Sequence, residues 1–599
     1  MWIESARQTL WEQSVKREPG TTSSGTRRLN GPQTTGRTLR NLSEPEYSIQ
    51  LTPDVDVVVR DGTTLRADVY RPAKRDPSPA LLAFSCYPRQ IQNSGAPLGF
   101  VEAGASDFWV SRGYAHIIAN SRGTGGSGGT YSWLDKTERE DIADLVEWTA
   151  AQDWCDGNVG MIGISYFAMA QLAGAIEAPE HLKAIFPVAT TGDIYEAAWH
   201  NGLLSSTFIS AWISGVATLA QRGDGFFRNS FIDAASRVLR SAPVHKRFEH
   251  LNGEAALSAL GVVMRAHFPQ EPWGDLLTDV TVNHQLRDEW WEERNLEALI
   301  EGSTIPTYLG CDWENVPLHL PSTFKLWEVL RKTAPVRVGM LGAGGLTWPW
   351  ESLHTEALGW FDHWLKGIDT GIMDGPEIRY WLPGADEFHS ATQWPPVGSE
   401  LHDYWLRDDG DLSSNEPLIG SASFEFLPTN LSLPKGAPPP RHPGFLSWQT
   451  QPLIDDIDVV GDCELVMDAS ITATDASWIV TLQDVSADGS TVDVTAGWLR
   501  AALREVDEQA SVPGAPKLRC ETAVAVQPGE QTRYRIPLIA TARRFARGHR
   551  IRLVVASDDQ TAQTPAIMGF HHQISGMQST NTVWSSSMLR LCVLPHPVQ

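Results

Sequence analysis

The sequence of 599 residues predicts an α/β domain built on a parallel sheet, followed by a β-sandwich. From residue 47 to about 190, short apolar runs alternate with helix-like segments, the pattern of parallel strands covered by helices on both faces. One of these strands ends on Ser165, and a helix begins at once after it. From about residue 375, short alternating strands replace that pattern, which favours a sandwich of the jelly-roll type.

The individual elements follow from local patterns. Two strand-like runs flank the turn Arg60-Asp61-Gly62 and predict a hairpin. Later segments carry either a continuous apolar run, typical of a buried strand, or apolar residues at helical spacing. They predict strands at 80–84, 115–119, 159–164, 307–310 and 336–340, and helices ending at Arg112, over 137–151 and from about 352 to 366.

Four regions result from this pattern. Residues 1–45 lack apolar periodicity and are expected to form a flexible N-terminal arm. The sheet domain is expected over 46–190 and 301–374, and the β-sandwich over 375–599. Residues 191–300 lose the strand pattern and become helix-rich. An insertion of this size within a sheet domain predicts a helical cap over the functional site.

Composition excludes several classes of function. An apolar content of 42% with 24 tryptophans predicts a folded protein, and a net charge of −24 argues against nucleic-acid binding. The six cysteines are scattered, so we expect free thiols, with no disulfide framework and no metal site. No leader-like or membrane-spanning apolar run occurs, which favours a cytoplasmic protein without membrane contact. A secreted form whose leader has been removed is the alternative.

Ser165 is the main candidate for chemistry. The run Gly163-Ile164-Ser165 ends an apolar strand and opens a helix, which is the arrangement of a nucleophile elbow. Such a turn presents the serine hydroxyl above the carboxyl edge of the sheet, with a helix N-terminus beneath it. We therefore predict that Ser165 is a nucleophile.

Several further segments occur in a characteristic order along the chain. They include Val59-Arg60-Asp61-Gly62, Ser121-Arg122-Gly123-Thr124-Gly125, Val146-Glu147-Trp148, Trp360-Phe361-Asp362-His363-Trp364, Asp484-Val485-Ser486 and Gly548-His549-Arg550. Together with Ser165-Tyr166 they resemble the cocaine esterase / X-prolyl dipeptidyl-peptidase (CocE/NonD) family of serine hydrolases. The resemblance covers about residue 50 onward, and it implies an α/β-hydrolase domain with a helical cap insertion and a C-terminal jelly roll.

The resemblance also implies an oxyanion hole. Members of the family use a tyrosine hydroxyl and the backbone N–H that follows the serine, which here correspond to Tyr87 and Tyr166. Two donors aimed at a developing oxyanion together stabilise it by a few kcal/mol. The alternative for Tyr87 is a packing role at the end of a strand.

The remaining triad positions depart from the family pattern. Asn315 stands where the acid is expected, and the neighbouring carboxylates Asp312 and Glu314 are the candidates to replace it. The loop from Gly342 to Thr347, where the resemblance places the histidine, has none. We therefore predict that any base for Ser165 comes from His354, His319 or His200, although for each of them alone a structural or surface role is the favoured interpretation.

Two functions follow from this degenerate triad. The first is a serine-type acyl hydrolase or acyl transferase acting on a small-molecule ester or amide. The second is a non-hydrolytic enzyme, such as a cyclase, lyase or isomerase of a specialised metabolite, that uses the oxyanion hole and capped pocket. An inactive binding protein is a third, weaker interpretation. We expect no cofactor; a homodimer stays open.

Overall fold

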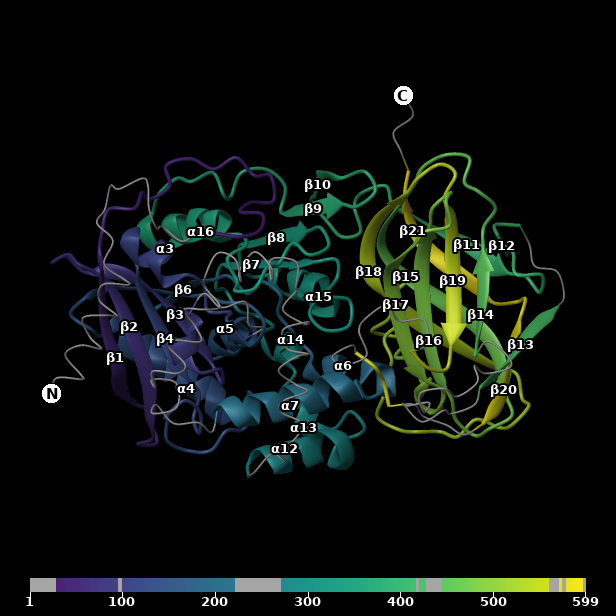
Figure 1. The fold of residues 1–599 in the computed structure, drawn as a ribbon, viewed down its shortest axis with the longest axis horizontal. Coiled ribbons are helices and arrows are strands. Elements are labelled where there is room, and N and C mark those ends of the chain that lie inside the picture. The colour runs from purple at the N-terminus through teal and green to yellow at the C-terminus, as the bar shows by residue number, and fades with distance from the viewer. Residues whose placement is uncertain are drawn as a thin grey trace.

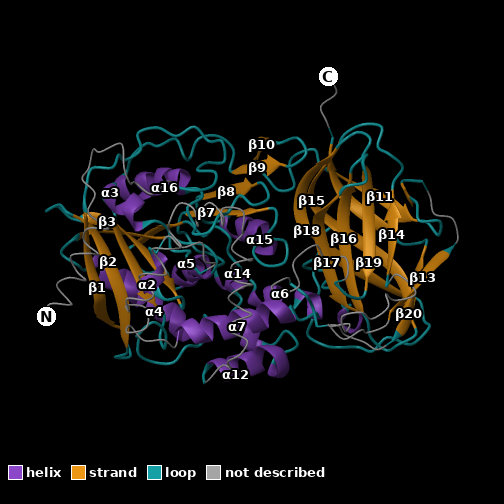
Figure 2. Cartoon of the chain, viewed as in Figure 1, coloured by secondary structure: helices purple, strands orange, loops and turns teal. Residues whose placement is uncertain are grey.

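The chain folds into an α/β domain, a group of helices beside it and a C-terminal β-sandwich (Figure 1). The computed structural model describes residues 29–94, 100–220, 271–415, 420–426, 444–559, 570–573 and 578–595. A mostly parallel sheet carries helices on both faces, and antiparallel strands make up the last part of the chain (Figure 2). The predicted fold class is confirmed.

One sheet forms the α/β domain and has ten strands within the described ranges. From edge to edge they are β1 (Ile49–Val58), β2 (Thr64–Pro72), β4 (Ala115–Asn120), β3 (Ser78–Ser85), β5 (Cys155–Met161), β6 (Leu182–Ile185), β7 (Thr307–Asp312), β8 (Val336–Leu341), β9 (Ile378–Leu382) and β10 (Glu387–Ala391). Pairs from β4 through β9 are parallel, and the β1, β2 and β10 pairings are antiparallel. Strands β3, β4, β7 and β8 are buried at every position, as their continuous apolar runs require.

Helices pack on both faces of this sheet (Figure 2). One face carries α3 (Ser106–Ser111) and α16 (His354–Lys366), and the other carries α4 (Lys136–Ala150), α5 (Tyr166–Ile176) and α15 (Leu320–Leu330). Helix α16 lies close to β5, because a Cβ atom at Gly160 would come within 2.8 Å of Phe361. A short helix, α2 (Arg89–Gln92), follows β3.

The helical insertion lies between β6 and β7. Its described helices are α6 (Ile194–Ala198), η1 (His200–Gly202), α7 (Ser206–Ala220), α12 (Trp273–Thr278), η2 (Asp279–Asn283), α13 (Glu289–Glu292) and α14 (Leu296–Leu299). Residues 221–270 of the expected cap lie outside the described residues.

The sandwich consists of two antiparallel sheets. The larger sheet contains β11 (Glu400–Leu406), β12 (Leu412–Ser413), β13 (Ser421–Phe426), β15 (Ile457–Ile471), β18 (Thr532–Phe545), β20 (Ser579–Trp584) and β21 (Met588–Leu594). The smaller sheet contains β14 (Phe445–Gln449), β16 (Ser477–Val485), β17 (Thr491–Arg500) and β19 (Arg550–Ala556), and η3 (Ala501–Leu503) follows β17. The cap contacts this sheet, since the His200 ring stacks on Trp498 with ring centroids 4.4 Å apart.

Two details differ from the expected boundaries. Residues 29–45 belong to the expected flexible arm, yet they lie against α16, where Thr35 Oγ1 donates to Glu356 at 2.8 Å and Ser43 Oγ donates to Asp362 at 2.8 Å. Residues 1–28 of the arm lie outside the described ranges. Strands β9 and β10 come after residue 374 but continue the first sheet, because β9 pairs with β8. The sandwich therefore starts at β11.

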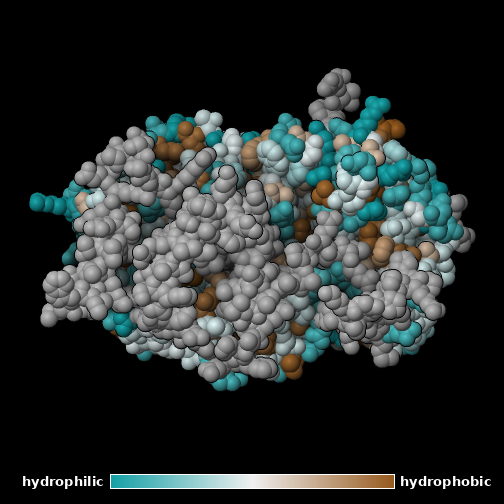
Figure 3. Space-filling model, in the orientation of Figure 1, coloured by the Kyte–Doolittle hydropathy of each residue, from teal (hydrophilic) through white to brown (hydrophobic). Residues whose placement is uncertain are grey.

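The surface and the thiols agree with the composition. Hydrophilic and neutral residues cover much of the sandwich surface in view, with apolar residues in small groups (Figure 3). All six cysteines are buried and unpaired. Within the described ranges, no helix is long and apolar enough to cross a membrane.

Candidate active site

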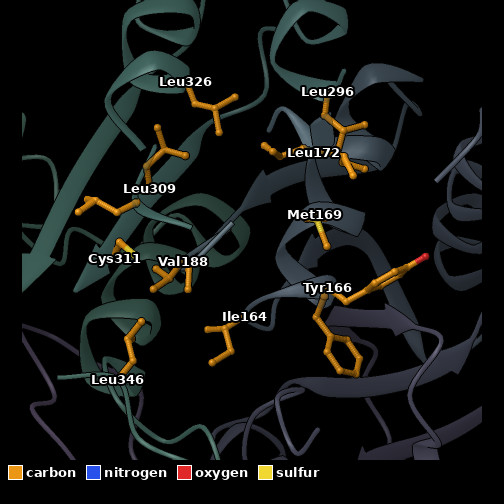
Figure 4. Packing of buried hydrophobic residues seen from close by; sticks show 14 of the residues in the cluster. Ile164, Tyr166, Met169, Leu172, Val188, Leu296, Leu309, Cys311, Leu326 and Leu346 are labelled. Carbon is orange, nitrogen blue, oxygen red and sulfur yellow. The ribbon is translucent and has the colours of Figure 1, made fainter. Parts of the chain in front are cut away.

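Ser165 occupies the sharp turn between β5 and α5. Its backbone has φ 58° and ψ −121°, a conformation that costs a residue with a side chain about 1–3 kcal/mol. The turn is held from outside, because the Ser165 N–H donates to the Ala189 carbonyl at 2.9 Å. The flanking side chains of Ile164 and Tyr166 belong to the buried core (Figure 4). At Gly163, with φ 122°, a Cβ atom would collide with Phe167, so the turn requires glycine.

Tyr87 lies beside Ser165. It follows β3, and its phenolic oxygen accepts a hydrogen bond from the Trp212 indole N–H of α7 at 2.9 Å. Burial, with a smaller contribution from the nearby Glu102 carboxyl, raises the pKa of Tyr87 well above its usual value, while hydrogen bonding to Trp212 and Ser165 opposes that rise. Tyr87 is thus a neutral phenol at physiological pH. Because its oxygen accepts from Trp212, its own hydrogen is available to a group above Ser165.

Tyr166 opens helix α5 directly after the serine. Its backbone N–H has no hydrogen-bond partner among the described residues, as expected in the first turn of a helix. Its hydroxyl donates to Glu138 at 2.7 Å and accepts from Tyr131 at 3.0 Å, while the Trp212 ring stacks on its ring at 6.2 Å. These contacts hold the Tyr166 side chain in place, so its hydroxyl does not compete for the unpaired Tyr166 backbone N–H.

A pocket between the sheet and the cap opens onto these groups. It encloses about 410 Å³ of space between atoms, part of it open to solvent. Its wall is aromatic and aliphatic apart from a few polar side chains, and no charged side chain lines it among the described residues. The lining residues are Tyr87, Trp133, Ser165, Met169, Thr191, Ile194, Ala197, Ala198, Phe208, Ile209, Trp212, Leu318 and His319.

The three candidate histidines occupy different places. His319 lines the pocket, where its Nδ1 is 2.9 Å from the Thr191 hydroxyl and burial lowers its pKa to about 3. His354 lies on α16, accepts from the Ala105 N–H through Nε2 at 3.1 Å and packs against Trp109. No histidine of the described ranges forms a hydrogen bond with Ser165.

His200 belongs to a chain of polar contacts at the boundary between cap and sandwich. Its Nδ1 is 2.6 Å from His572 Nε2, and its Nε2 donates to the Pro317 carbonyl at 2.6 Å. His572 in turn contacts Asp559 at 3.0 Å. Both ring nitrogens of His200 are therefore engaged, and it does not line the pocket.

The candidate carboxylates are also separated. Asp312 ends β7 as a buried side chain, and its Oδ2 accepts from the Leu346 backbone N–H at 3.2 Å while Oδ1 accepts from Asn315 at 2.5 Å. Burial raises the pKa of Asp312 to about 6. Glu314 is exposed to solvent. Asp312 thus reaches the loop after β8, as the acid of a triad would. The group that it binds there is the backbone N–H of Leu346, since this loop carries no histidine.

Sequence reasoning missed Glu102. This side chain is 2% exposed, and burial raises its pKa well above its usual value, while hydrogen bonding to Trp348 and Ser165 opposes that rise. Trp348 belongs to the end of the loop after β8 and donates its indole N–H to Glu102 Oε1 at 3.3 Å. The signal in the sequence was a single carboxylate within the apolar run Phe100-Val101-Glu102-Ala103. No group of three or more metal-ligating side chains occurs in the described part of the chain.

Two family models match the chain. The X-Pro dipeptidyl-peptidase (S15 family) model matches residues 61–347, and the X-Pro dipeptidyl-peptidase C-terminal non-catalytic domain model matches residues 370–568. The chain belongs to the cocaine esterase / X-Pro dipeptidyl-peptidase family of α/β-hydrolases. The resemblance drawn from its motifs is confirmed.

Relatives of this family member extend over most of its length. Cocaine esterase from Rhodococcus sp. is 26% identical over 570 residues, which cover 86% of this chain and 92% of the relative. A putative serine esterase from Mycobacterium tuberculosis is 25% identical and covers 84% of this chain and 90% of the relative. A CocE/NonD family hydrolase structure from Staphylococcus aureus has a TM-score of 0.73 at 20% identity, covering 97% of this chain and 100% of its own, and supports the fold. The chain is therefore a hydrolase-fold enzyme.

Proposed function

We propose that this enzyme is a serine-type acyl hydrolase or acyl transferase for an uncharged small-molecule ester or amide, with Ser165 as the nucleophile. The observation that carries the proposal is the elbow itself. Ser165 is held at φ 58° between β5 and α5, with its side chain on the wall of a capped pocket. Packing does not require a residue with a side chain to adopt this strained conformation, whereas a nucleophile elbow does.

Two hydrogen-bond donors support an oxyanion hole above Ser165. The Tyr166 N–H is unpaired in the described part of the chain, and the Tyr87 hydroxyl has its hydrogen available because its oxygen accepts from Trp212. A carbonyl carbon attacked by Ser165 would place its oxygen between these donors. Each donor is expected to stabilise the developing charge by on the order of 3 kcal/mol.

The pocket chemistry favours a neutral substrate. A peptide with a free amino terminus brings an ammonium group, which is costly to bury without a carboxylate partner. None of the described lining residues carries a charge, and Trp133, Phe208 and Trp212 offer broad apolar surfaces. The enzyme is accordingly proposed to prefer esters with an apolar acyl or alcohol group over dipeptide substrates.

A second candidate function has one observation in its favour. Since no histidine in the described ranges forms a hydrogen bond with Ser165, the oxyanion donors and the apolar pocket could promote a cyclisation, elimination or rearrangement without acyl transfer. In that case Ser165 would not be an activated nucleophile. The two candidates differ in whether Ser165 becomes covalently modified.

Labelling with a fluorophosphonate separates them, because the reagent needs an activated serine and no knowledge of the substrate. We expect Ser165 to be labelled, and Ser165→Ala to abolish both labelling and hydrolysis of short p-nitrophenyl esters, by roughly 10⁴-fold or more. Ser205→Ala is the matched control, since it removes a buried hydroxyl that has no hydrogen-bond partner among the described residues and does not line the pocket. An unlabelled Ser165 together with an active Ser165→Ala variant would favour the non-hydrolytic candidate.

A further inference from the structure

Glu102 is fixed beside the elbow by its own backbone. Its N–H donates to Gln92 Oε1 at 2.9 Å, and its carbonyl accepts from the Ile164 N–H at 3.2 Å. Ile164 is the residue immediately before the nucleophile. The backbone of Glu102 is therefore held next to the elbow by the buried Gln92 side chain and by the backbone N–H of Ile164.

The two oxygens of the Glu102 carboxyl differ in their surroundings. Oε1 accepts from the Trp348 indole, whereas Oε2 is buried and has no hydrogen bond of ordinary geometry among the described residues. Ser165 lies near this carboxyl group, because its hydroxyl lowers the pKa of Glu102. A buried carboxyl with one held oxygen and one unused oxygen next to a serine hydroxyl is well placed to accept a proton.

We propose that the Glu102 carboxylate is the general base for Ser165, held in place by Trp348. This inference rests on the function proposed above, in which Ser165 attacks a carbonyl carbon. Glu102 then replaces the missing histidine, and the loop after β8 contributes the donor that orients the base.

The acylation step balances as follows. The Ser165 Oγ–H proton passes to Glu102, the Oγ electron pair forms a bond to the carbonyl carbon, and the carbonyl π pair moves onto oxygen. The tetrahedral intermediate collapses, and Glu102 returns the proton to the leaving alcohol or amine. In deacylation, water gives its proton to Glu102 and attacks the acyl group, and the proton then passes to Ser165 Oγ. Glu102 and Ser165 are both regenerated.

Burial makes a carboxylate a stronger base than it is in water. Burial raises the pKa of Glu102 well above its usual value, and a raised pKa makes its carboxylate a better proton acceptor. The titratable groups that face it are Tyr87 and Cys86, and burial raises the pKa of each well above its usual value.

The competing bases have other partners. His319 shares its Nδ1 with Thr191, and its pKa of about 3 makes it a weak proton acceptor. Asp312 binds the Leu346 N–H and Asn315. Glu102, by contrast, has one carboxyl oxygen without a hydrogen bond in the described ranges, and the Ser165 hydroxyl is close enough to lower the pKa of this carboxyl group.

The test compares two carboxyl-to-amide variants in the full-length enzyme. Glu102→Gln should lower the rate of fluorophosphonate labelling and of p-nitrophenyl ester hydrolysis by roughly 10³-fold or more, without a matching rise in KM. Glu297→Gln is the control, because this α14 carboxyl also has a buried oxygen without a hydrogen bond and an elevated pKa, of about 7, yet Ser165 is not among the groups that shift its pKa. A loss of less than about ten-fold in a folded Glu102→Gln variant would overturn the proposal.

The pH dependence of labelling in the unmodified enzyme gives a second measurement that needs no variant. Because the ionised form is active, the rate should fall as pH decreases through an apparent pKa above 4.5, and this limb should vanish in Glu102→Gln. A limb near pH 3 that disappears in His319→Gln would assign the base to His319 instead. In both outcomes Ser165 is labelled, so the proposed function stands; an unlabelled native enzyme would mean that the function itself has failed.

Discussion

The carboxyl edge of the first sheet has two halves that differ in how far they keep the residues of the family's catalytic triad. At the ends of β3 and β5, Tyr87, Ser165 and Tyr166 lie together, and we propose that they act as a nucleophile with two oxyanion donors. At the ends of β7 and β8, the same kind of loops carry different chemistry, since Asp312 binds the Leu346 backbone and Trp348 binds Glu102.

This difference shows that the nucleophile elbow and the acid–base residues can change independently of each other. The elbow is determined by sterics within a few consecutive residues, where Gly163 and the strained Ser165 leave little freedom. An acid–base pair depends only on which side chains long loops bring near the serine, so another residue can supply the proton acceptor without disturbing the turn. Each prediction below alters a residue of one half and measures the effect on ester hydrolysis, on labelling of Ser165 or on stability.

The largest expected effect is on the elbow half. Tyr87→Phe removes one oxyanion donor and should lower kcat for ester hydrolysis by roughly 10²–10³-fold, with a smaller change in KM, because the donor acts mainly in the transition state. Steady-state kinetics on p-nitrophenyl esters measure this. Tyr195→Phe, a buried cap tyrosine that does not line the pocket, serves as the control. An unchanged kcat in Tyr87→Phe would remove Tyr87 from the oxyanion hole.

The sequence predicted the elbow half because its information is local. The Gly163-Ile164-Ser165 turn joins consecutive elements, and the continuous apolar runs of β3, β4, β7 and β8 predict a covered parallel sheet. The proposed base, Glu102, was not predictable in this way. Glu102 is held in place by hydrogen bonds with Gln92 and Trp348, which no spacing in the sequence connects.

Other differences have similar causes. Residues 29–45 pack through polar contacts such as Thr35 with Glu356, so the segment carries no apolar period to reveal it. Strands β9 and β10 alternate like sandwich strands, and only their pairing with β8 assigns them to the first sheet. Period identifies a strand but not the sheet that it joins.

A smaller effect is expected from the residue that holds the proposed base. Trp348→Phe keeps an aromatic ring but removes the indole N–H that lowers the pKa of Glu102. The pKa of Glu102 should therefore rise further, and the acid limb of the labelling rate should move to higher pH. Above the shifted limb, we expect a loss of less than about ten-fold. A limb that stays in place would separate Trp348 from the base.

The smallest effect on activity is expected from Asp312→Asn. In a triad that uses this acid to orient a histidine, such a change costs about 10⁴-fold in kcat. Here Asp312 binds the Leu346 backbone and Asn315, so we expect a loss of less than about ten-fold in ester hydrolysis. A loss of 10³-fold or more would show that the β7 half still serves the serine, and the contrast between the two halves would collapse.

The same variant should change the pH dependence of stability. Burial raises the pKa of Asp312 from 3.8 to about 6, so the folded state favours its protonated form. The stability that this proton contributes is full below about pH 4 and is lost as pH rises through 6, a change on the order of 3 kcal/mol. The amide introduced by Asp312→Asn cannot titrate, so urea unfolding of the variant should lack this part of the decline between about pH 4 and 7. If both proteins lose stability equally over that range, Asp312 is ionised in the folded state at acidic pH, which would suit a carboxylate paired with a nearby imidazolium rather than with backbone.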